Sequence, residues 1–453
     1  MGYENLNNKN NKLLFIQINE IDRQFLIKGS KKYNCRNICN FFKNKHIIKT
    51  KSPDKIQDKN LDPWVQSVSI NTGIESKKHK IYNIGQHVSK DTVQIWDILA
   101  NKNVKCSVWG TMNSIMKKNK NLKLYFPDPW NFNAKAYPKK FNNFLALPKY
   151  FAQNYLDFKN FKFLNLIIKF FFSLIFSNFF LYFFKNISFF YKIIKIGRIK
   201  NFNLFFIFDL ISLVLFRYEI KKNSSEFALI FLNSFAHFQH NNWDEKESEK
   251  VYFLTADKVF EVIKELTKDF DHILVTNGFT QKKIKKIYTL RPFNPENFLR
   301  NKLKLKFKKL DQDMTNGGFV HFNSNIQANL SIKIMKSLNI FGMDFFQIKK
   351  ISNKKIFYKI NIFSKKIINA NIFSRLTKKN LSKYFITNKY KLKKESNFNA
   401  QLWKDIYFIK TTGRHISEGF LLMNYVDKKI VFKKFIQNHK IFNVIKNNFF
   451  VTN

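Results

Sequence analysis

Cysteine is scarce in this chain of 453 residues, which contains only Cys35, Cys39 and Cys106. An odd, sparse set does not form a disulfide framework, and the Cys35–Cys39 spacing lacks the second pair that a structural zinc site needs. We therefore expect reduced, buried thiols. A chain of this length can bury a large core, which predicts one large α/β domain or two smaller ones.

Acidic residues are also few, because 31 Asp and Glu stand against 80 Lys and Arg, for a formal net charge of +49. Such a charge attracts phosphorylated substrates, anionic lipid or nucleic acid over long range. However, Lys, Asn, Ile and Phe are abundant together while Gly stands at 12 and Pro at 8, which is typical of an AT-rich genome. Two interpretations stay open: compositional drift on solvated faces, or a real polyanionic partner.

Signatures of nucleic-acid-binding and secreted proteins are missing. The sequence has no recognition helix, glycine-rich loop or RNA-binding motif, so nucleic acid is not an expected partner. The apolar run at 13–18 is too short for the core of a signal peptide, and Gly2 lacks the hydroxyl residue that myristoylation requires. These observations predict a cytoplasmic location.

Long apolar runs are limited to residues 155–220, where the stretch 170–184 is almost wholly apolar. Lys162, Lys169 and Lys185 interrupt this region, and the unbroken part falls short of the ~20 residues that a spanning helix needs. Three interpretations stay open: a buried helical insertion over a sheet, a membrane-surface helix pair with basic flanks, or a transmembrane hairpin. The second would attach the protein peripherally to the inner face of an anionic membrane.

Apolar runs that end in polar residues predict a mostly parallel central sheet flanked by helices. Such runs occur at 13–18, 227–234 and 272–278, and a helix–turn–strand pattern occupies 92–110. Residues 62–86 read instead as a loop that leads into a short segment and a Thr72–Gly73 turn. The repeated order of strand, polar tip and helix is typical of an α/β fold. We expect two parts of one α/β core at 1–150 and 223–453, a helical apolar insertion at 151–222, and a β-hairpin at 340–363.

Polar side chains follow the predicted strands at their carboxyl ends, which lie at one edge of a parallel sheet. They include Glu20 after the first strand, Asn233 and His237 after the run at 227–232, Asn277 after the next, and His415 near the C-terminus. Carboxylate, amide and imidazole groups together suit a divalent metal ion and a phosphate. The sequence therefore predicts a metal-assisted phosphate site at this edge.

Five motifs, taken in order, resemble the alkaline phosphatase superfamily, in particular its type I phosphodiesterase/nucleotide pyrophosphatase branch. They are I-N-E-I-D (18–22), V-S-I-N-T-G-I-E-S-K-K-H-K-I (68–81), N-S-F-A-H (233–237), V-T-N-G-F (275–279) and G-R-H-I-S-E-G (413–419). The resemblance implies an alkaline-phosphatase-like fold and metal-dependent hydrolysis or transfer of phosphate esters or phosphodiesters. It also implies a divalent cofactor, Zn, Mn or Mg, and a phosphorylated small molecule or glycan as substrate.

Several positions depart from the family pattern. Glu20 stands where the family has an aspartate, Asn233 replaces another, and Asn277 with Gly278 replaces an Asp-His pair. The family nucleophile falls on or beside Pro63, which cannot attack a phosphorus atom. The remaining catalytic candidates are Asp62, Ser67 and, as a phosphate clamp, Arg414. With fewer anionic ligands we expect a single ion, held by members of the set Glu20, Asn233, His237, His240, Asn277 and His415.

Two functions follow from this pattern. The first is a metal-dependent phosphodiesterase or phosphatase, which the ordered histidines favour. The second is a catalytically inactive relative that binds a phosphorylated glycan, a lipid head group or another polyanion at the membrane surface, which the missing nucleophile favours.

Overall fold

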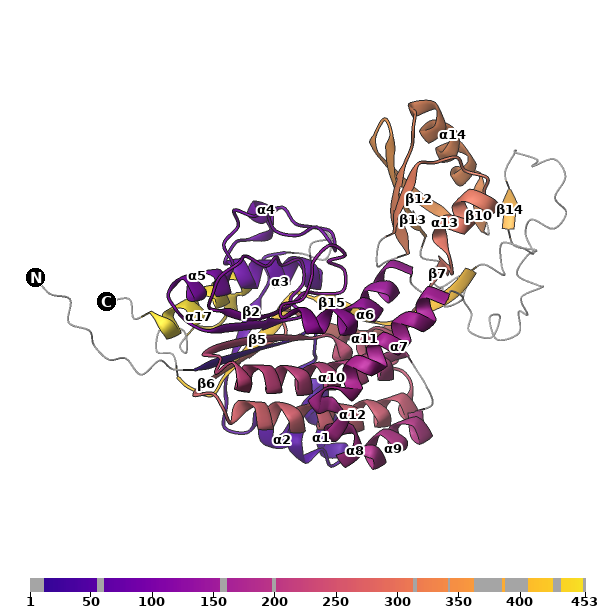
Figure 1. Ribbon diagram of the computed structural model, residues 1–453. Coiled ribbons are helices and arrows are strands. Elements are labelled where there is room, and N and C mark those ends of the chain that lie inside the picture. The colour runs from indigo at the N-terminus through magenta and orange to yellow at the C-terminus, as the bar shows by residue number, and fades with distance from the viewer. Residues whose placement is uncertain are drawn as a thin grey trace, which may run out of the picture. The chain divides into compact units, whose positions relative to one another are not determined.

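The computed structural model describes two compact units (Figure 1). Unit 1 comprises the described residues within 1–153, 161–284 and 413–453, and unit 2 those within 154–160 and 285–412. The described residues are 12–54, 61–154, 161–197, 201–312, 316–340, 343–361, 385–387, 406–426 and 433–450.

Unit 1 is built on a sheet with the strand order β17-β2-β16-β6-β1-β5-β3-β4. In it β1 pairs in parallel with β5 and β6, β3 pairs in parallel with β4 and β5, and β16 runs antiparallel to β6 and β2. The strands are β1 (Leu13–Ile18), β2 (His46–Lys51), β3 (Cys106–Trp109), β4 (Leu122–Phe126), β5 (Phe227–Leu232), β6 (His272–Thr276), β16 (Glu418–Met423) and β17 (Ile436–Gln437). The predicted fold class, a mostly parallel sheet flanked by helices, is confirmed.

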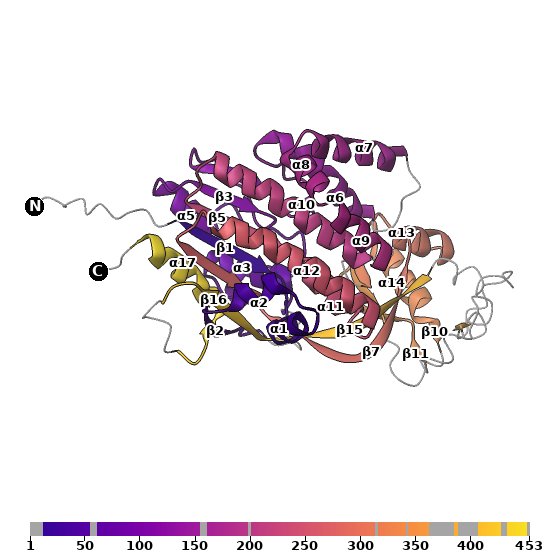
Figure 2. The same cartoon turned by 90° about the horizontal axis from the view of Figure 1, so that it is seen from below.

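Helices cover both faces of this sheet (Figures 1 and 2). Successive side chains of a strand point to opposite faces. Leu14 and Ile16 of β1 therefore join the core under α10 (Asn201–Lys222) and α12 (Lys246–Thr267), while Leu13 and Phe15 join the core under α5 (Ile95–Asn101) and α17 (Ile441–Phe449). A strand buried on both faces reads as a continuous apolar run, which is why β1 could be predicted. The helices of unit 1 outside 155–222 are α1 (Arg23–Lys32), α2 (Arg36–Phe42), α3 (Pro63–Thr72), α4 (Ser76–His79), α5 (Ile95–Asn101), α6 (Asn142–Asn154), α11 (Ser234–Asn241), α12 (Lys246–Thr267) and α17 (Ile441–Phe449).

Helix α3 occupies the stretch that was expected to be a loop. It begins with Pro63, whose fixed φ suits the first helical turn, and ends at Gly73, which adopts the left-handed conformation at φ 72°. All its residues are buried, so it has no polar stripe and no helical periodicity. The loop prediction was wrong for this reason.

Four helices fill the apolar region of unit 1: α7 (Phe161–Ile175), α8 (Asn178–Lys185), α9 (Ile187–Gly197) and α10 (Asn201–Lys222). Phe206, Leu210 and Phe216 of α10 are fully buried beneath the sheet. Within the described residues, only α7 (from Phe163) and α8 taken together, bent by 82°, meet the length and composition of a membrane span, and no helix does so alone.

Unit 2 has its own sheet and core. The sheet order is β12-β13-β9-β8, all antiparallel, and its core includes Phe298, Val320 and Tyr358. The predicted hairpin is confirmed, because β12 and β13 pair across a turn at Asn353–Lys354. The remaining α-helices and strands of the described residues are β8 (Lys309–Gln312), β9 (Gly317–His321), β10 (Leu338–Ile340), β11 (Met343–Asp344), β12 (Phe346–Ser352), β13 (Lys355–Ile360), β14 (Phe385–Thr387), α13 (Pro295–Asn297), α14 (Asn325–Lys336), and β7 (Thr280–Pro292) paired with β15 (Ile406–Ile416).

All three cysteines are free thiols, as predicted. Cys35 and Cys106 are buried, but Cys39 is exposed, so the expectation of burial was wrong for that residue. Cys39 lies on the outer side of α2, whose buried residues are Ile38, Phe41 and Phe42.

Candidate metal site

Glu20 lies just beyond the carboxyl end of β1, where the chain leaves the sheet. Two backbone hydrogen bonds hold the chain at this point, from Asn19 N to Leu232 O (2.9 Å) and from Glu20 N to Asn277 O (3.2 Å). Glu20 adopts the left-handed conformation (φ 57°), which is unfavourable for a side chain other than Gly, Asn or Asp. Gln239 holds this backbone by donating from Nε2 to Glu20 O (2.7 Å). The result is a carboxylate that is only 1% exposed.

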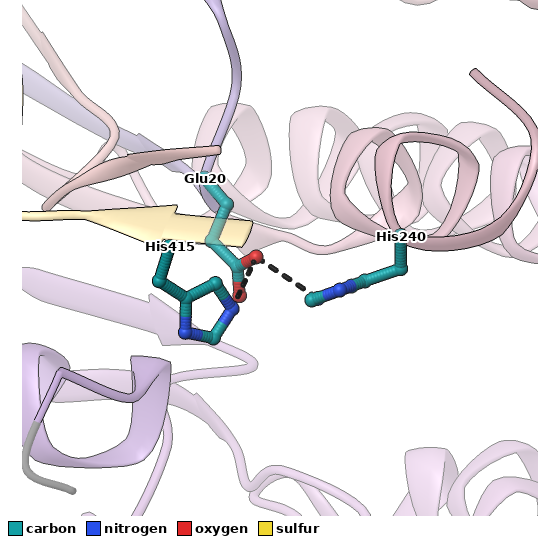
Figure 3. Close-up of side chains that lie close together, drawn as sticks. All are labelled: Glu20, His240 and His415. Carbon is teal, nitrogen blue, oxygen red and sulfur yellow. Dashed lines mark ion pairs between the residues drawn. The ribbon is translucent and has the colours of Figure 1, made fainter. Parts of the chain in front are cut away.

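Two imidazoles meet this carboxylate at one oxygen (Figure 3). His240 Nε2, from α11, lies 3.0 Å from Glu20 Oε2, and His415 Nε2, from β15, lies 3.1 Å from the same atom. One ligand atom from each of the three residues lies within 4.8 Å of the others, so the group could hold a metal ion. The sequence predicted all three residues as ligands, and the fold brings them together from segments more than 150 residues apart.

The ring of His415 is oriented by its other nitrogen. His415 Nδ1 donates to Leu61 O (2.8 Å), and Asp62 Oδ1 lies 3.7 Å from the same nitrogen. Such a bond fixes the tautomer, so the neutral ring carries its lone pair on Nε2, the atom that faces Glu20. His415 Nε2 is buried and makes no hydrogen bond of good angle among the described residues, despite the 3.1 Å distance to Glu20. This is the arrangement that a metal-binding histidine requires.

Attraction between Glu20 and the imidazoles outweighs burial in setting the pKa values of Glu20 and His415. Burial would raise the pKa of Glu20, but the His415 and His240 imidazoles hold it well below its usual range. Burial would likewise lower the pKa of His415, but the Glu20 carboxylate raises it to about 9. Without a metal the two groups therefore form a buried ion pair. A bound dication would take the place of the imidazolium proton, because metal ligands must be deprotonated.

Gln281 and Gly413 complete the wall around Glu20, and neither was predicted from the sequence. Gln281 Nε2 donates to Glu20 Oε2, and Gly413 lies directly against this amide. A Cβ at Gly413 would stand 2.0 Å from Gln281 Oε1 and 2.6 Å from Gln239 O, so no larger residue fits without a shift. Gly413, two residues before His415, is therefore needed for the close packing of β15 against Gln281 and Gln239. No local pattern marks a lone glutamine such as Gln281 as part of a site.

Asparagines that were expected as ligands are engaged with other partners. Asn277 donates from Nδ2 to Ile21 O (2.9 Å) and accepts at Oδ1 from Phe420 N (2.9 Å). Asn233 accepts at Oδ1 from Asn19 Nδ2 (2.7 Å), and the same Asn19 nitrogen donates to Glu20 Oε1 (3.1 Å). Both amides thus position the strand tips around Glu20.

His237 lies beside the cluster but is turned into an aromatic contact. Its ring stacks on Phe205 at 3.4 Å between centroids, and its Nε2 lies 3.3 Å from Asn233 Nδ2. Burial, and then the neighbouring His240, lower the pKa of His237 to about 3, so the ring is neutral. Of the six predicted ligands, the structure places Glu20, His240 and His415 together, and Asn233, Asn277 and His237 around them.

The catalytic candidates occupy three different environments. Asp62 is half-buried at the start of α3 beside His415. Ser67 is buried, accepts from Asn71 Nδ2 (3.2 Å), and lines a cavity of about 10 Å³ that Asn19 and Asn277 also line. Arg414 is exposed and precedes His415 on β15, so strand alternation directs it to the opposite face. Only Asp62 therefore lies in contact with the cluster.

Another serine, Ser69, has a histidine neighbour that resembles a nucleophile–base pair. Ser69 Oγ lies 3.0 Å from His79 Nε2, but His79 Nδ1 accepts from Ile81 N (3.0 Å). The neutral ring must then carry its hydrogen on Nε2, so it donates to the serine and cannot accept the serine proton. Burial also lowers the pKa of His79 to about 4. This pair is structural.

Comparisons with known proteins give similar folds and no close relative. No protein-family model matches the chain. No curated protein matches it either. Similar solved structures include a murine ectonucleotide pyrophosphatase/phosphodiesterase 5 at 8% identity and TM-score 0.44, covering 98% of this chain and 96% of that one.

Two further structures are similar over a comparable length. An alkaline phosphatase from an Antarctic bacterium has 13% identity and TM-score 0.38, covering 96% of this chain and 97% of that one. A phosphonoacetate hydrolase from Sinorhizobium meliloti 1021, in complex with phosphonoformate, has 8% identity and TM-score 0.40, covering 96% and 95%.

All three proteins are members of the alkaline phosphatase superfamily, the superfamily that the sequence motifs resemble. The similar structures are those of a phosphodiesterase, a phosphatase and a phosphonate hydrolase. At such low identity, the ligands and the reaction of this chain have to be argued from its own residues.

Proposed function

We propose that this protein is a hydrolase of phosphate esters that uses a single divalent metal ion held by Glu20, His240 and His415. One observation carries the proposal: both imidazole Nε2 atoms converge on the same carboxylate oxygen, at 3.0 and 3.1 Å. Three protein ligands leave a coordination position open for water or substrate, as catalytic sites do and structural sites do not.

The donor set favours Zn²⁺ or Mn²⁺ over Mg²⁺. Two imidazoles suit borderline metals, whereas Mg²⁺ prefers oxygen ligands and retained waters. The contact from His415 Nδ1 to Leu61 O supports this assignment, because metal-binding histidines almost always donate their second N–H to a carbonyl or carboxylate. When bound, the ion would polarise a phosphoryl oxygen and acidify a water molecule.

Asp62 is the proposed general base. Its carboxylate lies 3.7 Å from His415 Nδ1 and is 27% exposed, so it can accept a proton from an attacking water. In this reaction the water oxygen forms a bond to phosphorus, the ester P–O bond breaks, and the leaving oxygen takes a proton from solvent. No hydroxyl nucleophile is needed, which agrees with Pro63 at the position of the family nucleophile. The chain's large positive charge would attract the anionic substrate.

Metal binding and turnover test the proposal together. The full chain should bind about one equivalent of Zn²⁺ or Mn²⁺ by calorimetry and hydrolyse bis(p-nitrophenyl) phosphate or p-nitrophenyl phosphate. His240→Ala and His415→Ala should each lower both metal affinity and turnover by about 100-fold or more, because each removes a ligand. His321→Ala is the matched control, since it also removes a histidine paired with a carboxylate, Asp311, at 2.8 Å in unit 2.

Two results would overturn the proposal. Absence of metal binding by gently purified, folded protein would exclude a metal-dependent reaction. Equal residual turnover in His240→Ala, His415→Ala and the unaltered protein would assign the activity to a contaminant.

A further inference from the structure

Helix α7 is apolar on two faces, only one of which meets the core. Phe163, Phe170 and Leu174 lie on the inner side, where Phe170 and Leu174 belong to the main core of unit 1. The opposite stripe recurs at the spacing of one helix face and points to solvent. Its members and their exposed fractions are Leu164 (54%), Ile168 (46%), Phe171 (58%), Phe172 (55%) and Ile175 (45%). A surface helix of a soluble protein normally carries polar residues there.

The exposed apolar stripe continues along the next two helices, which can be followed in Figure 2. Helix α7 contacts α8, and α8 contacts α9, while α8 and α9 rest against α10 and α12. Phe176, at the corner where α7 and α8 bend by 82°, is 84% exposed. The other exposed members are Phe180, Leu181 and Phe184 of α8 and Ile187, Tyr191 and Ile194 of α9. We call these residues, with the five of α7, the α7–α9 face.

Basic residues border this face, and acidic ones are missing from it. Lys169, Lys185, Lys192 and Lys195 are exposed on the same three helices. The sequence from residue 158 to residue 208 contains no Asp or Glu. Scattered exposed apolar residues are ordinary, but exposed aromatic and aliphatic side chains on three consecutive helices that carry lysines and no acidic residue mark an interaction site.

We propose that the α7–α9 face docks on the surface of an anionic lipid bilayer. Helices of this type lie in the membrane interface, with apolar side chains in the acyl boundary and lysines at the phosphate groups. A second copy of this chain is the less suitable occupant, because the same face of that copy would place its lysines against these lysines. Phe176 at the corner, the most exposed of these side chains, is positioned to insert first.

Vesicle flotation tests this inference on the full chain. The protein should float with phosphatidylcholine vesicles that contain about one third phosphatidylglycerol, and should bind pure phosphatidylcholine at least about tenfold more weakly. Raising the salt concentration should release it, because exposed charges are screened.

Two variant sets separate the apolar and the basic contributions. Phe172→Asp combined with Phe176→Asp should abolish flotation, whereas Ile326→Asp, at a position 79% exposed on α14, should leave it unchanged. Replacing Lys169, Lys185, Lys192 and Lys195 with Gln should weaken binding to the anionic vesicles at least about tenfold. Replacing four other exposed lysines with Gln, namely Lys77, Lys78, Lys80 and Lys90, is the control of equal charge. Circular dichroism verifies that each variant is folded.

Three outcomes would overturn the inference: no flotation with either vesicle, equal binding to neutral and anionic vesicles, or equal loss of binding in the two lysine sets. A concentration-dependent dimer that Phe172→Asp with Phe176→Asp disrupts, without flotation, would assign the face to a second copy instead. None of these measurements requires turnover or metal, so this inference and the proposed function can fail separately.

Discussion

Two groups of polar side chains surround the end of β1, and they differ in what their atoms contact. The imidazoles of His240 and His415 both face the carboxylate of Glu20. The amides of Asn233 and Asn277 instead contact other amides, a histidine and the backbone. All of these residues were predicted as metal ligands. The difference shows that the side chain of a strand-tip residue can bind a ligand only where the backbone groups around it are already hydrogen-bonded to other partners.

Loss of the carboxylate should give the largest effect. Glu20→Gln keeps the shape of the side chain but removes the charge that both imidazoles face, so metal affinity should fall by about 100-fold or more. Competition with a chromophoric chelator measures this change. Gln281→Glu, which adds a carboxylate next to Glu20, is an informative counterpart that should not lower affinity. A Glu20→Gln protein that binds metal as tightly as the unaltered chain would break the comparison.

Asn277→Ala should affect folding rather than metal binding. The substitution leaves Ile21 O and Phe420 N without their side-chain partner in a buried environment. Each unsatisfied buried group costs about 1–3 kcal/mol, so the free energy of unfolding should fall by about 2–4 kcal/mol. Urea denaturation measures the stability, and the metal affinity of the folded fraction should stay within about threefold. A large loss of affinity with unchanged stability would instead make Asn277 a ligand.

Asp209→Asn tests how the helix that carries His240 is held. Asp209 Oδ2 accepts from Asn233 N (3.1 Å) and Ser234 N (2.9 Å) at the start of α11, and burial raises the pKa of this carboxyl to about 7. A folded pKa above the unfolded value of 3.8 contributes stability that is complete below pH 3.8 and is lost as the pH rises through 7. Asparagine can accept the same bonds without ionising. Relative to the unaltered chain, the variant should therefore gain about 1–2 kcal/mol between about pH 5 and pH 8. Equal pH dependence of urea unfolding in both proteins would contradict this.

Asn233→Asp should give the smallest effect and is the sharpest test of the comparison. Aspartate can still accept from Asn19 Nδ2 and can face His237 Nε2, so stability should change by less than about 1 kcal/mol. Metal affinity should change by less than about threefold if this position only supports the site. A gain of about tenfold or more, measured by the same chelator competition, would place the side chain among the ligands.

The sequence predicted the central sheet well and the site in part. Strands such as β1 and β5 are apolar on both faces, so their runs are continuous and need no periodicity to be recognised. Their tips drew attention to Glu20, His240 and His415, which the fold brings together. Which tip residues meet depends on side-chain hydrogen bonds between distant segments, such as that of Gln281 with Glu20, and no local pattern records these. The separate core of unit 2 was likewise missed, because residues 285–412 contain few long apolar runs.

Helix α3 contains no lysine although the chain is rich in lysine. The protein has 80 Lys and Arg among 453 residues, yet the segment Pro63–Thr72 contains no charged residue. Every one of its side chains is buried, so it has no position at which a lysine could reach water. A helix that is buried on every side is held by its neighbours along its whole length. The start of α3, which carries Asp62 beside His415, is therefore a fixed support for one side of the candidate site.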